Sequence, residues 1–321
     1  MKIGNVEIKG YAALAPMAGV SDRAMREICT EYGAAFCVGE LTSAKAVVLG
    51  DGKSKVLLKS VGGKIRAPQI FGCDPDIMAR AAQKALEYEP SFIDINMGCP
   101  APKVALNGGG SALMRDIPLA AKIIKAVARA VNVPVTVKMR TGWDGEHINA
   151  VDLAKAAEQA GAAAVTVHGR TRAQMYAPPV DYKTIAEVKR AVKIPVIANG
   201  DINSGAAAKY TYENTGCDFV SVGRAARGNP FIFSEINAFM EGKPYTPPTL
   251  KERLDTCMRQ IEKMREYKDG YIAMLEARKH VSWYVTGLSG AANLRRLACG
   301  ITVPEDVEAI IQKALEENPD M

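Results

Sequence analysis

One cysteine of the chain stands where a protein would place a reactive group. The stretch FIDINMGCPAPKV (92–104) ends an apolar run in a turn, with Cys99 between Gly98 and Pro100. A core cysteine normally lies within an apolar run, where it behaves as a small hydrophobic side chain. A thiol just beyond the run can reach a ligand and act as a nucleophile or as a general acid. Because no histidine close in sequence offers a base, the role of proton donor fits at least as well. The stretch NGGGSALM (107–114) predicts a mobile, glycine-rich loop beside this thiol.

Lys138 and His168 stand at or near the ends of two further apolar runs. In VPVTVKMR (133–140) Lys138 alternates with Val137 and Met139, so it shares a face with Thr136 and points away from the side that packs on helices. Three roles suit this lysine: a Schiff base, a cation beside a phosphate or a reduced flavin, or an outward-facing surface residue. A lone histidine is often only a structural donor, but the position of His168 in TVHGR favours a functional role.

Two glycine-containing turns follow later runs. Gly200 lies in ANGDI (198–202), and Gly223 and Arg224 lie in SVGRAARGNPFIF (221–233). Backbone N–H groups at such turns commonly bind a phosphate, and the arginine adds a positive charge. The alternative is that these glycines serve only to turn the chain.

The elements that must position these residues form an alternating pattern. Short β-rich apolar runs cover 11–16, 34–40, 67–72, 92–97, 133–140, 163–169, 194–201 and 218–224. Helical stretches cover 74–89, 117–131, 147–161, 182–192 and 204–216. Eight strands alternating with helices predict parallel pairing in a closed (β/α)8 TIM barrel, whereas a doubly wound sheet usually has fewer strands. Polar residues recur at the carboxyl ends of the runs, where such barrels build active sites: Gln69, Asn96, Lys138, His168, Asn199, Asp201 and Arg224.

A second, smaller domain follows a proline-rich boundary. After GKPYTPPT (242–249) the pattern becomes helical, so we expect a barrel domain over 1–243 and an all-helical domain over 244–321. The first part of this helical domain carries an excess of Lys and Arg over Asp and Glu, and its last part the reverse. The net charge of +6 permits a polyanionic partner without demanding one.

The composition is that of a globular enzyme, with 48% hydrophobic and 24% charged residues. No apolar stretch reaches the roughly 18 residues that span a bilayer, and the amino-terminal residues lack the apolar segment of a signal peptide. The seven cysteines contain no C-x-x-C pair, so neither a disulfide framework nor a zinc site is indicated. We therefore expect a cytoplasmic protein with no membrane partner and no bound metal, and nothing indicates an obligate protein partner.

Nine ordered motifs resemble those of the tRNA-dihydrouridine synthases, with the overall look of the bacterial B-type branch. They are APMAGVSD, QIFG, DINMGCPAPKV, GSALM, VKMRTGW, TVHGRTR, IANGDI, GRAARGNPFIF and ARKHVSWY, and they span most of the chain up to Gly287. The resemblance implies FMN as cofactor, NADPH as reductant and uridines of tRNA as substrate. Hydride would pass from flavin N5 to uracil C6, with Cys99 as the proton donor to C5.

The resemblance also assigns the residues around the flavin. Those implied to bind the cofactor are Pro16, Met17, Ala18, Gln69, Lys138, His168, Asn199, Gly200, Asp201, Gly223 and Arg224. The uracil must leave the folded tRNA to reach them, as in other enzymes that act on bases. Basic residues beside the barrel mouth and in the helical domain are candidates for binding the RNA backbone: Arg140, Arg170, Arg172, Lys263, Arg265, Arg278 and Lys279.

Other functions fit parts of the same sequence. An FMN barrel that reduces a free pyrimidine, or an aldolase acting through Lys138, would need no helical domain. A tRNA-binding or chaperone-like protein whose chemistry is secondary would keep its cellular effect without Cys99.

Overall fold

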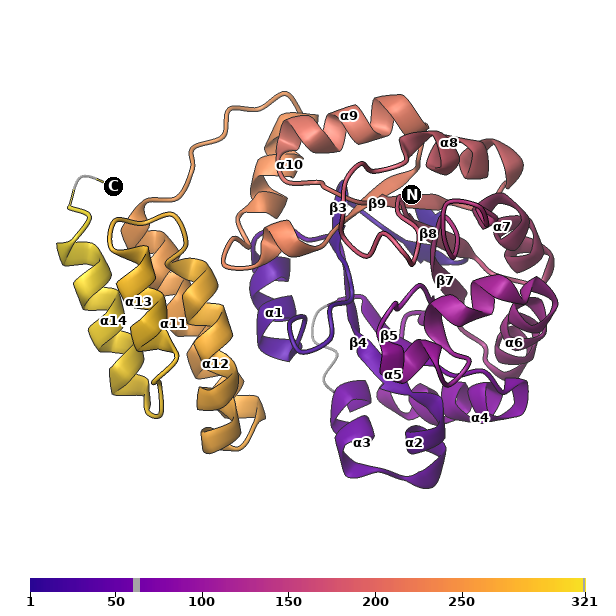
Figure 1. Cartoon of the computed structure of the whole chain (residues 1–321), viewed down its shortest axis with the longest axis horizontal. Helices are drawn as coiled ribbons and strands as arrows, with labels where there is room; N and C mark the ends of the chain where they lie inside the picture. The colour runs from indigo at the N-terminus through magenta and orange to yellow at the C-terminus, as the bar shows by residue number, and fades with distance from the viewer. Residues whose placement is uncertain (60–63, 320) are drawn as a thin grey trace.

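Parallel strands form a closed barrel within the larger part of the molecule, on the right of Figure 1. The computed structural model describes residues 1–59, 64–319 and 321. Within this part of the chain the barrel strands are β3 (Ala12–Leu14), β4 (Cys37–Ser43), β5 (Arg66–Phe71), β6 (Ile93–Met97), β7 (Val135–Arg140), β8 (Ala164–His168), β9 (Val196–Asn199) and β10 (Phe219–Val222). They pair in chain order, and β10 closes the barrel against β3. The predicted TIM barrel is confirmed, with one strand in each predicted run.

Helices surround the barrel. They are α1 (Arg23–Glu31), α2 (Ala44–Leu49), α3 (Gly52–Lys59), α4 (Pro75–Ala85), α5 (Pro102–Ala105), α6 (Ile117–Ala130), α7 (Ala150–Gln159), α8 (Tyr182–Ala191), α9 (Gly205–Thr215) and α10 (Ile232–Met240). The five predicted helical stretches are confirmed as α4 and α6–α9. A short side chain caps the start of several helices by accepting a backbone N–H, as Asp74, Asp116 and Ser204 do. Such caps satisfy donors that the first turn leaves unpaired, so they fix where each helix begins.

The barrel interior is apolar at the end opposite the carboxyl ends of the strands. Phe36, Phe92 and Phe219 pack together there, with ring centroids 5.5 and 5.7 Å apart. A small hairpin of β1 (Lys2–Ile3) and β2 (Val6–Glu7) adds Ile3 and Ile8 to the same cluster. The sequence did not predict this hairpin, because two-residue strands are too short to show a period. The hydrophobic plug confines the polar side chains of the barrel to its opposite, carboxyl end.

Toward the carboxyl ends of the strands, the barrel interior holds rows of polar residues. Gln69, Asp94 and Thr136 are register partners across β5, β6 and β7, and Asn96 pairs with Lys138 one layer higher. Facing side chains of adjacent strands share one side of a sheet, so each row points into the barrel. Val135, Val137 and Met139 pack in the outer core instead. The predicted inward direction of Lys138 is confirmed.

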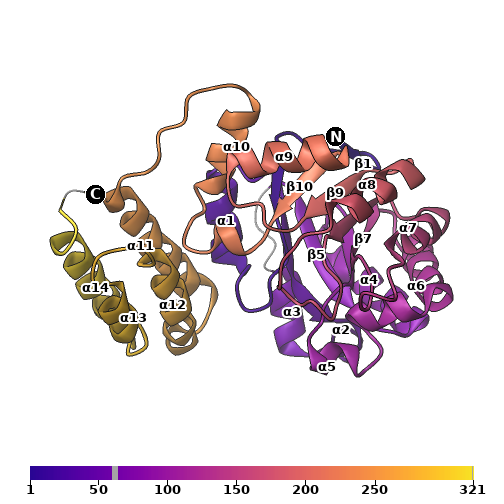
Figure 2. The ribbon, with the colours of Figure 1, turned by 45° about the horizontal axis from the view of Figure 1, so that its top comes forward.

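A bundle of four helices lies beside the barrel, joined to it by an extended segment (Figures 1 and 2). The helices are α11 (Leu250–Tyr267), α12 (Gly270–Tyr284), α13 (Ala291–Ala298) and α14 (Pro304–Glu316). They enclose a second hydrophobic core, to which Ala24 of α1 also belongs. The side chain of Thr249 caps α11 in a capping box with Glu252. No helix in the described part of the chain is long and apolar enough to cross a membrane.

The bundle docks on α1 through charged side chains. Lys263 Nζ lies 3.1 Å from Glu27 Oε2 and 3.5 Å from Glu31 Oε1, and Lys268 Nζ lies 2.5 Å from Asp22 Oδ2. Asp22 also caps α1, directly after the loop that carries Met17 and Ala18. The contact therefore ties the bundle to one side of the barrel mouth.

The loop after β10 also touches the bundle, at a position that only glycine fits. Gly228 has φ +63°, and a Cβ there would lie 2.5 Å from the carbonyl carbon of Trp283 in α12. A contact this short forces the backbones apart.

We expect Gly228→Ala to destabilise the protein more than Gly50→Ala does. Gly50 has φ +80°, but a Cβ there meets no atom within 4 Å, so its substitution costs only the backbone strain, about 1 kcal/mol. Gly228→Ala adds the clash, for a total of about 2–4 kcal/mol. Urea unfolding followed by circular dichroism measures both variants. Equal losses of stability would contradict the close packing of the loop on α12.

Candidate active site

A cavity of about 880 Å³ opens at the carboxyl ends of the barrel strands. Residues at the end of, or just after, every barrel strand line it. The lining includes all the positions that sequence reasoning grouped around a cofactor, together with Cys99: Pro16, Met17, Ala18, Gln69, Lys138, His168, Asn199, Gly200, Asp201, Gly223 and Arg224. The structure thus brings into one site residues that lie up to 208 positions apart, from Pro16 to Arg224.

The cavity is strongly cationic. Its basic lining residues are Lys138, Arg140, Arg170, Arg224 and Arg227, whereas Asp201 is the one carboxylate among the lining residues. Arg170 binds both oxygens of Asp201, at 2.5 and 3.1 Å, and Arg224 approaches Oδ1 at 3.1 Å. The bond from Arg170 holds the pKa of Asp201 below its ordinary value, so this carboxylate is ionised. It neutralises part of the charge and orients Arg224, leaving a net attraction for an anion.

Lys138 lies deep in this cavity. Its Nζ donates to Asn199 Oδ1 at 3.1 Å, and Asn199 Nδ2 donates in turn to the Ser221 carbonyl at 2.7 Å. Burial and then the nearby Arg140 lower the pKa of Lys138 to about 8. An ammonium has three donors, so this one retains donors for an anionic or carbonyl-bearing ligand.

His168 ends β8 beside Lys138 and is neutral. Burial, followed by the positive charge of Lys138, holds the pKa of the imidazole far below its ordinary value. A neutral ring has one donor and one acceptor nitrogen. His168 therefore offers the cavity a hydrogen bond without a further charge.

A chain of hydrogen bonds holds the turn that carries Cys99. Gly98 N and Cys99 N donate to Asn96 Oδ1 at 3.2 and 2.9 Å, and Asn96 Nδ2 donates to Gln69 Oε1 at 2.8 Å. Gln69 Nε2 donates to Asp94 Oδ2 at 2.7 Å. The Asp94 carboxylate can only accept, so Gln69 turns its NH2 group toward Asp94 and its oxygen toward Asn96. Asn96 then turns its NH2 group toward Gln69 and its oxygen toward the turn. Asp94 thereby fixes the orientation of both amides; we call this chain the Asp94 relay.

The glycine-rich segment after Cys99 is packed, and the expectation of a mobile loop was wrong. Gly109, Gly110 and Ser111 are buried, and Gly110–Arg115 forms a 3-10 turn, η2. Ser111 N donates to the Cys99 carbonyl at 3.1 Å. At Gly110, with φ +57°, a Cβ would lie 2.8 Å from that same oxygen. Gly110 therefore allows the chain to pack closely against the backbone and Cβ of Cys99.

Two of the arginines predicted to bind RNA are buried. Arg140 is 3% exposed and donates to the carbonyls of Gly98, Thr171 and Met175. Arg170 is 1% exposed and is occupied by Asp201 and by the Ala177 carbonyl. Both guanidinium groups hold the loops of the cavity together. Arg172, in contrast, lies partly exposed with its guanidinium over the ring of Trp143.

The four candidates of the bundle lie in different settings. Lys263 is paired with α1, and Arg278 Nε donates to the Ile301 carbonyl within the bundle. Arg265 is exposed. Lys279 reaches the loop after β3 at the barrel mouth. The Nζ of Lys279 lies 3.6 Å from where a Cβ on Gly19 would be. Of these four candidates, Lys263 and Arg278 already have partners within the protein.

Sequence reasoning missed several residues of the site. Asp94 sits on the inward face of β6, two positions before Asn96, which the sequence did single out. The same alternation that showed the direction of Lys138 on β7 would have found Asp94. Tyr176 lines the mouth, 50% exposed, with the guanidinium of Arg224 4.6 Å from its ring. Nothing in the local pattern of RAQMYAPP marks this tyrosine, because its place depends on how the loop folds back.

A parallel barrel with a cationic cavity and a thiol at the carboxyl ends of its strands defines an enzyme of the TIM-barrel class. Comparison with known proteins specifies the family: the chain belongs to the dihydrouridine synthases, whose family model, Dihydrouridine synthase (Dus), matches residues 13–318. The resemblance drawn from the motifs is confirmed.

Individual relatives agree. The chain is 45% identical over 298 residues to tRNA-dihydrouridine synthase B of Vibrio vulnificus, covering 92% of each chain. It is 44% identical over 297 residues to the protein of the same name from Pseudomonas aeruginosa, covering 92% of this chain and 90% of the relative. Among solved structures, morphinone reductase shares the fold with a TM-score of 0.55 at 13% identity, covering 79% of this chain and 91% of that one.

We expect Asp94→Ala to loosen the turn that carries Cys99. This substitution, unlike Asp94→Asn, leaves Gln69 no acceptor at this position, which breaks the Asp94 relay at a cost of about 1–3 kcal/mol. Alkylation of Cys99 by iodoacetamide, followed by peptide mass spectrometry, should become several-fold faster.

Thr136→Val is the matched control. It removes the second donor to Asp94, Thr136 Oγ1 at 2.5 Å, without reversing either amide. Cys99 in this variant should react at the wild-type rate. If Cys99 in Asp94→Ala also reacts at that rate, the relay does not position the turn.

Proposed function

We propose that this chain reduces the C5–C6 double bond of specific uridines in tRNA, with FMN as cofactor and NADPH as reductant. The observation that carries the proposal is the Cys99 thiol, fixed by the Asp94 relay at the edge of a cationic cavity, in a member of the dihydrouridine synthase family. The relatives named tRNA-dihydrouridine synthase B support tRNA as the substrate.

The cavity fits a phosphate-bearing flavin. A Cβ at Gly223 would meet no atom within 4 Å, so the backbone there is open to a ligand, and Arg224 lies next to it. Gly223, Arg224, Asn199 and Gly200 would hold the phosphate end, and Asp201 would act by orienting Arg224. Pro16, Met17 and Ala18 would lie against the ring system, and Gln69, Lys138 and His168 along its polar edge. When bound, the flavin supplies hydride chemistry, accepting from NADPH and donating to the uracil ring.

Lys138 would stabilise negative charge in the cavity. Its Nζ is held by Asn199 and surrounded by protein, where an ion pair is stronger than in water. His168, being neutral, adds a hydrogen bond without repelling the lysine. We propose that these two side chains favour the anionic state of the ligand beside them.

Cys99 would deliver a proton to the base. The thiol belongs to a turn whose backbone is fixed by Asn96 and Ser111. A fixed donor avoids the entropic cost of searching for the reacting atom. The uracil must be extruded from the tRNA to reach it. Tyr176 lies at the mouth as an exposed aromatic surface on which an extruded base can stack.

The helical bundle would bind the tRNA backbone, so we propose 1–243 as the catalytic domain and 244–321 as the tRNA-binding domain. Lys279 lies at the mouth, and Arg265 is exposed on α11. All seven cysteines are free, which agrees with the reducing cytoplasm as the compartment that we propose.

We expect Cys99→Ala to separate the two half-reactions. The variant should bind FMN and oxidise NADPH as the wild type does, but reduction of uridine in unmodified tRNA should fall by about 100-fold or more, the usual scale for a positioned acid. Single-turnover mixing of the pre-reduced protein with tRNA measures the second step. Cys73→Ala is the control, because Cys73 is an exposed thiol outside the cavity lining. Flavin reoxidation at the wild-type rate in Cys99→Ala would refute proton donation.

We also expect FMN affinity to fall as the pH rises through about 8. In the protein without flavin, burial and then Arg140 lower the pKa of Lys138 to about 8, so its charge is lost above that pH. The flavin phosphate stays doubly charged, since its second pKa is about 6. Kd should therefore increase with pH above about 8, by up to tenfold per unit, as one proton is linked to binding. Titration of flavin fluorescence measures this.

Lys138→Met tests the origin of this pH dependence. Its FMN affinity should be weaker at about pH 7 and should not change between about pH 7 and 9.5. If the variant keeps the wild-type slope, another group titrates.

A further inference from the structure

Two arginines near the mouth stack on one tryptophan. The guanidinium carbon of Arg172 lies 4.7 Å from the Trp143 ring centroid, and that of Arg115 lies 5.0 Å from it. Within residues 1–59 and 64–319, neither guanidinium makes a hydrogen bond or ion pair with the protein. Arg115 is exposed, and Arg172 and Trp143 are partly exposed. We call this group the Trp143 cluster.

The cluster is built from three loops that are joined to one another. Arg115 ends η2, which follows the Cys99 turn, Trp143 follows β7, and Arg172 follows β8. Arg172 N donates to the Gly142 carbonyl at 2.9 Å, and Asn149 Nδ2 donates to the Met114 carbonyl at 2.6 Å. These bonds fix the positions of the loops, so the two guanidinium groups are held rather than free.

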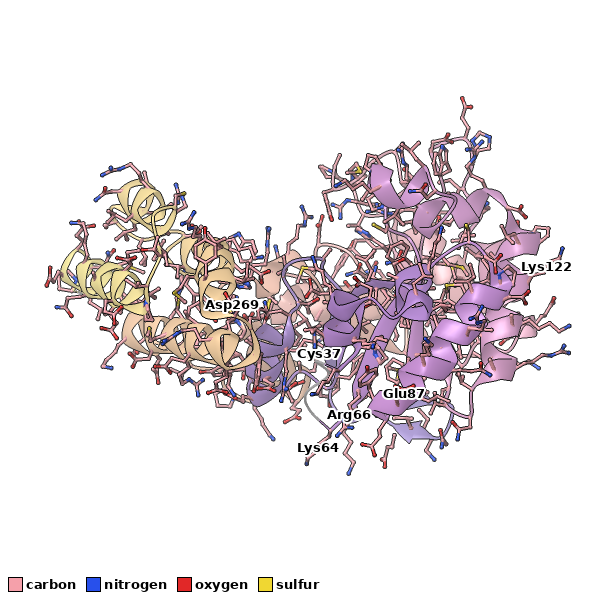
Figure 3. The ribbon with its side chains drawn as sticks, turned by 90° about the horizontal axis from the view of Figure 1, so that it is seen from below. Cys37, Lys64, Arg66, Glu87, Lys122 and Asp269 are labelled. Atoms are coloured by element: carbon pink, nitrogen blue, oxygen red, sulfur yellow. The ribbon has the colours of Figure 1, made fainter. Side chains whose placement is uncertain are left out.

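The position of the cluster around the barrel sets it opposite the helical bundle. The bundle docks on α1, which follows β3, and β7 is four strands away from β3 in either direction around the closed barrel. Figure 1 shows α7 on the far side of the barrel from α11 and α12. Figure 3 likewise places Lys122 of α6, which precedes β7, far from Asp269 of the bundle. The cavity mouth lies between the two.

The bundle side of the mouth carries a similar arrangement. Arg227, which lines the cavity, lies with its guanidinium 5.0 Å from the ring centroid of Trp283 in α12. The chain has only two tryptophans, and each holds arginine beside the mouth. A polyanion that reaches across the cavity would meet oriented guanidinium groups on both sides.

We propose that Arg115, Trp143 and Arg172 bind phosphates of the tRNA backbone on the side of the mouth opposite the helical bundle. Arginine binds phosphate through paired N–H donors, and stacking on an aromatic ring fixes the plane that carries those donors. A contact there and another at the bundle would hold the RNA across the mouth, with the target nucleotide over the cavity. This inference rests on the proposed function, since it takes tRNA as the ligand.

The test is the salt dependence of binding to an unmodified tRNA transcript. Arg115→Gln with Arg172→Gln should weaken binding roughly 10-fold at about 0.1 M salt. The slope of log K against log salt should become less steep by about 1.5, because each lost phosphate contact contributes about 0.7–0.9. Flavin content and NADPH oxidation should not change, because neither arginine lines the cavity.

Two further variants separate a local contact from net charge. Arg129→Gln with Arg190→Gln makes the same charge change in the last turns of α6 and α8, at the other end of the barrel, and should bind with the wild-type slope. Arg115→Lys with Arg172→Lys should restore most of the slope. Equal slopes in the wild type and the Arg115/Arg172 variant would overturn the cluster as an RNA contact, as would an equal loss in the Arg129/Arg190 control. A wild-type protein that fails to bind tRNA would instead overturn the proposed function itself.

Discussion

Polar side chains inside the barrel are buried, so they need hydrogen-bond partners within the protein. The buried carboxylate of Asp94 provides such partners. Asp94 accepts from Gln69 and Thr136 on the two neighbouring strands, and burial raises its pKa. An unpaired polar group at this depth would cost several kcal/mol, so each member of the relay depends on the next. One hydrogen-bonded chain thus positions both Gln69, the proposed contact to the cofactor, and the turn that carries Cys99, the proposed proton donor. The apolar plug of Phe36, Phe92 and Phe219 beneath it confines this polarity to one end.

The distribution of charge follows from the same constraint. Burial, and then the repulsion between the cations gathered in the cavity, lower the pKa of Lys138 and keep His168 neutral. Asp201 offsets part of this repulsion by pairing with Arg170 and Arg224. The remaining positive charge favours an anion.

Arginines and lysines near the mouth differ in function because they differ in partners. Arg140 and Arg170 donate to loop carbonyls and to Asp201, and Lys263 pairs with carboxylates of α1. These groups are structural supports in the protein as it stands. Exposed groups that lack such partners, as in the Trp143 cluster, remain free to bind an external polyanion. The two kinds of residue both carry positive charge. They differ in whether that charge already has a partner within the protein.

The sequence by itself determined the eight-stranded barrel, the helical region after it and the polar strand-end residues that line the cavity. Strand periodicity and the polar residues at strand ends are local signals, and a barrel collects those ends at one rim. Tertiary structure alone decided which cations are available, where the two-residue strands β1 and β2 pair, and that the glycines near Cys99 pack closely. It alone placed Tyr176 at the mouth and Arg115 against Trp143. Such contacts join residues far apart in the chain, so no local pattern of residue types records them.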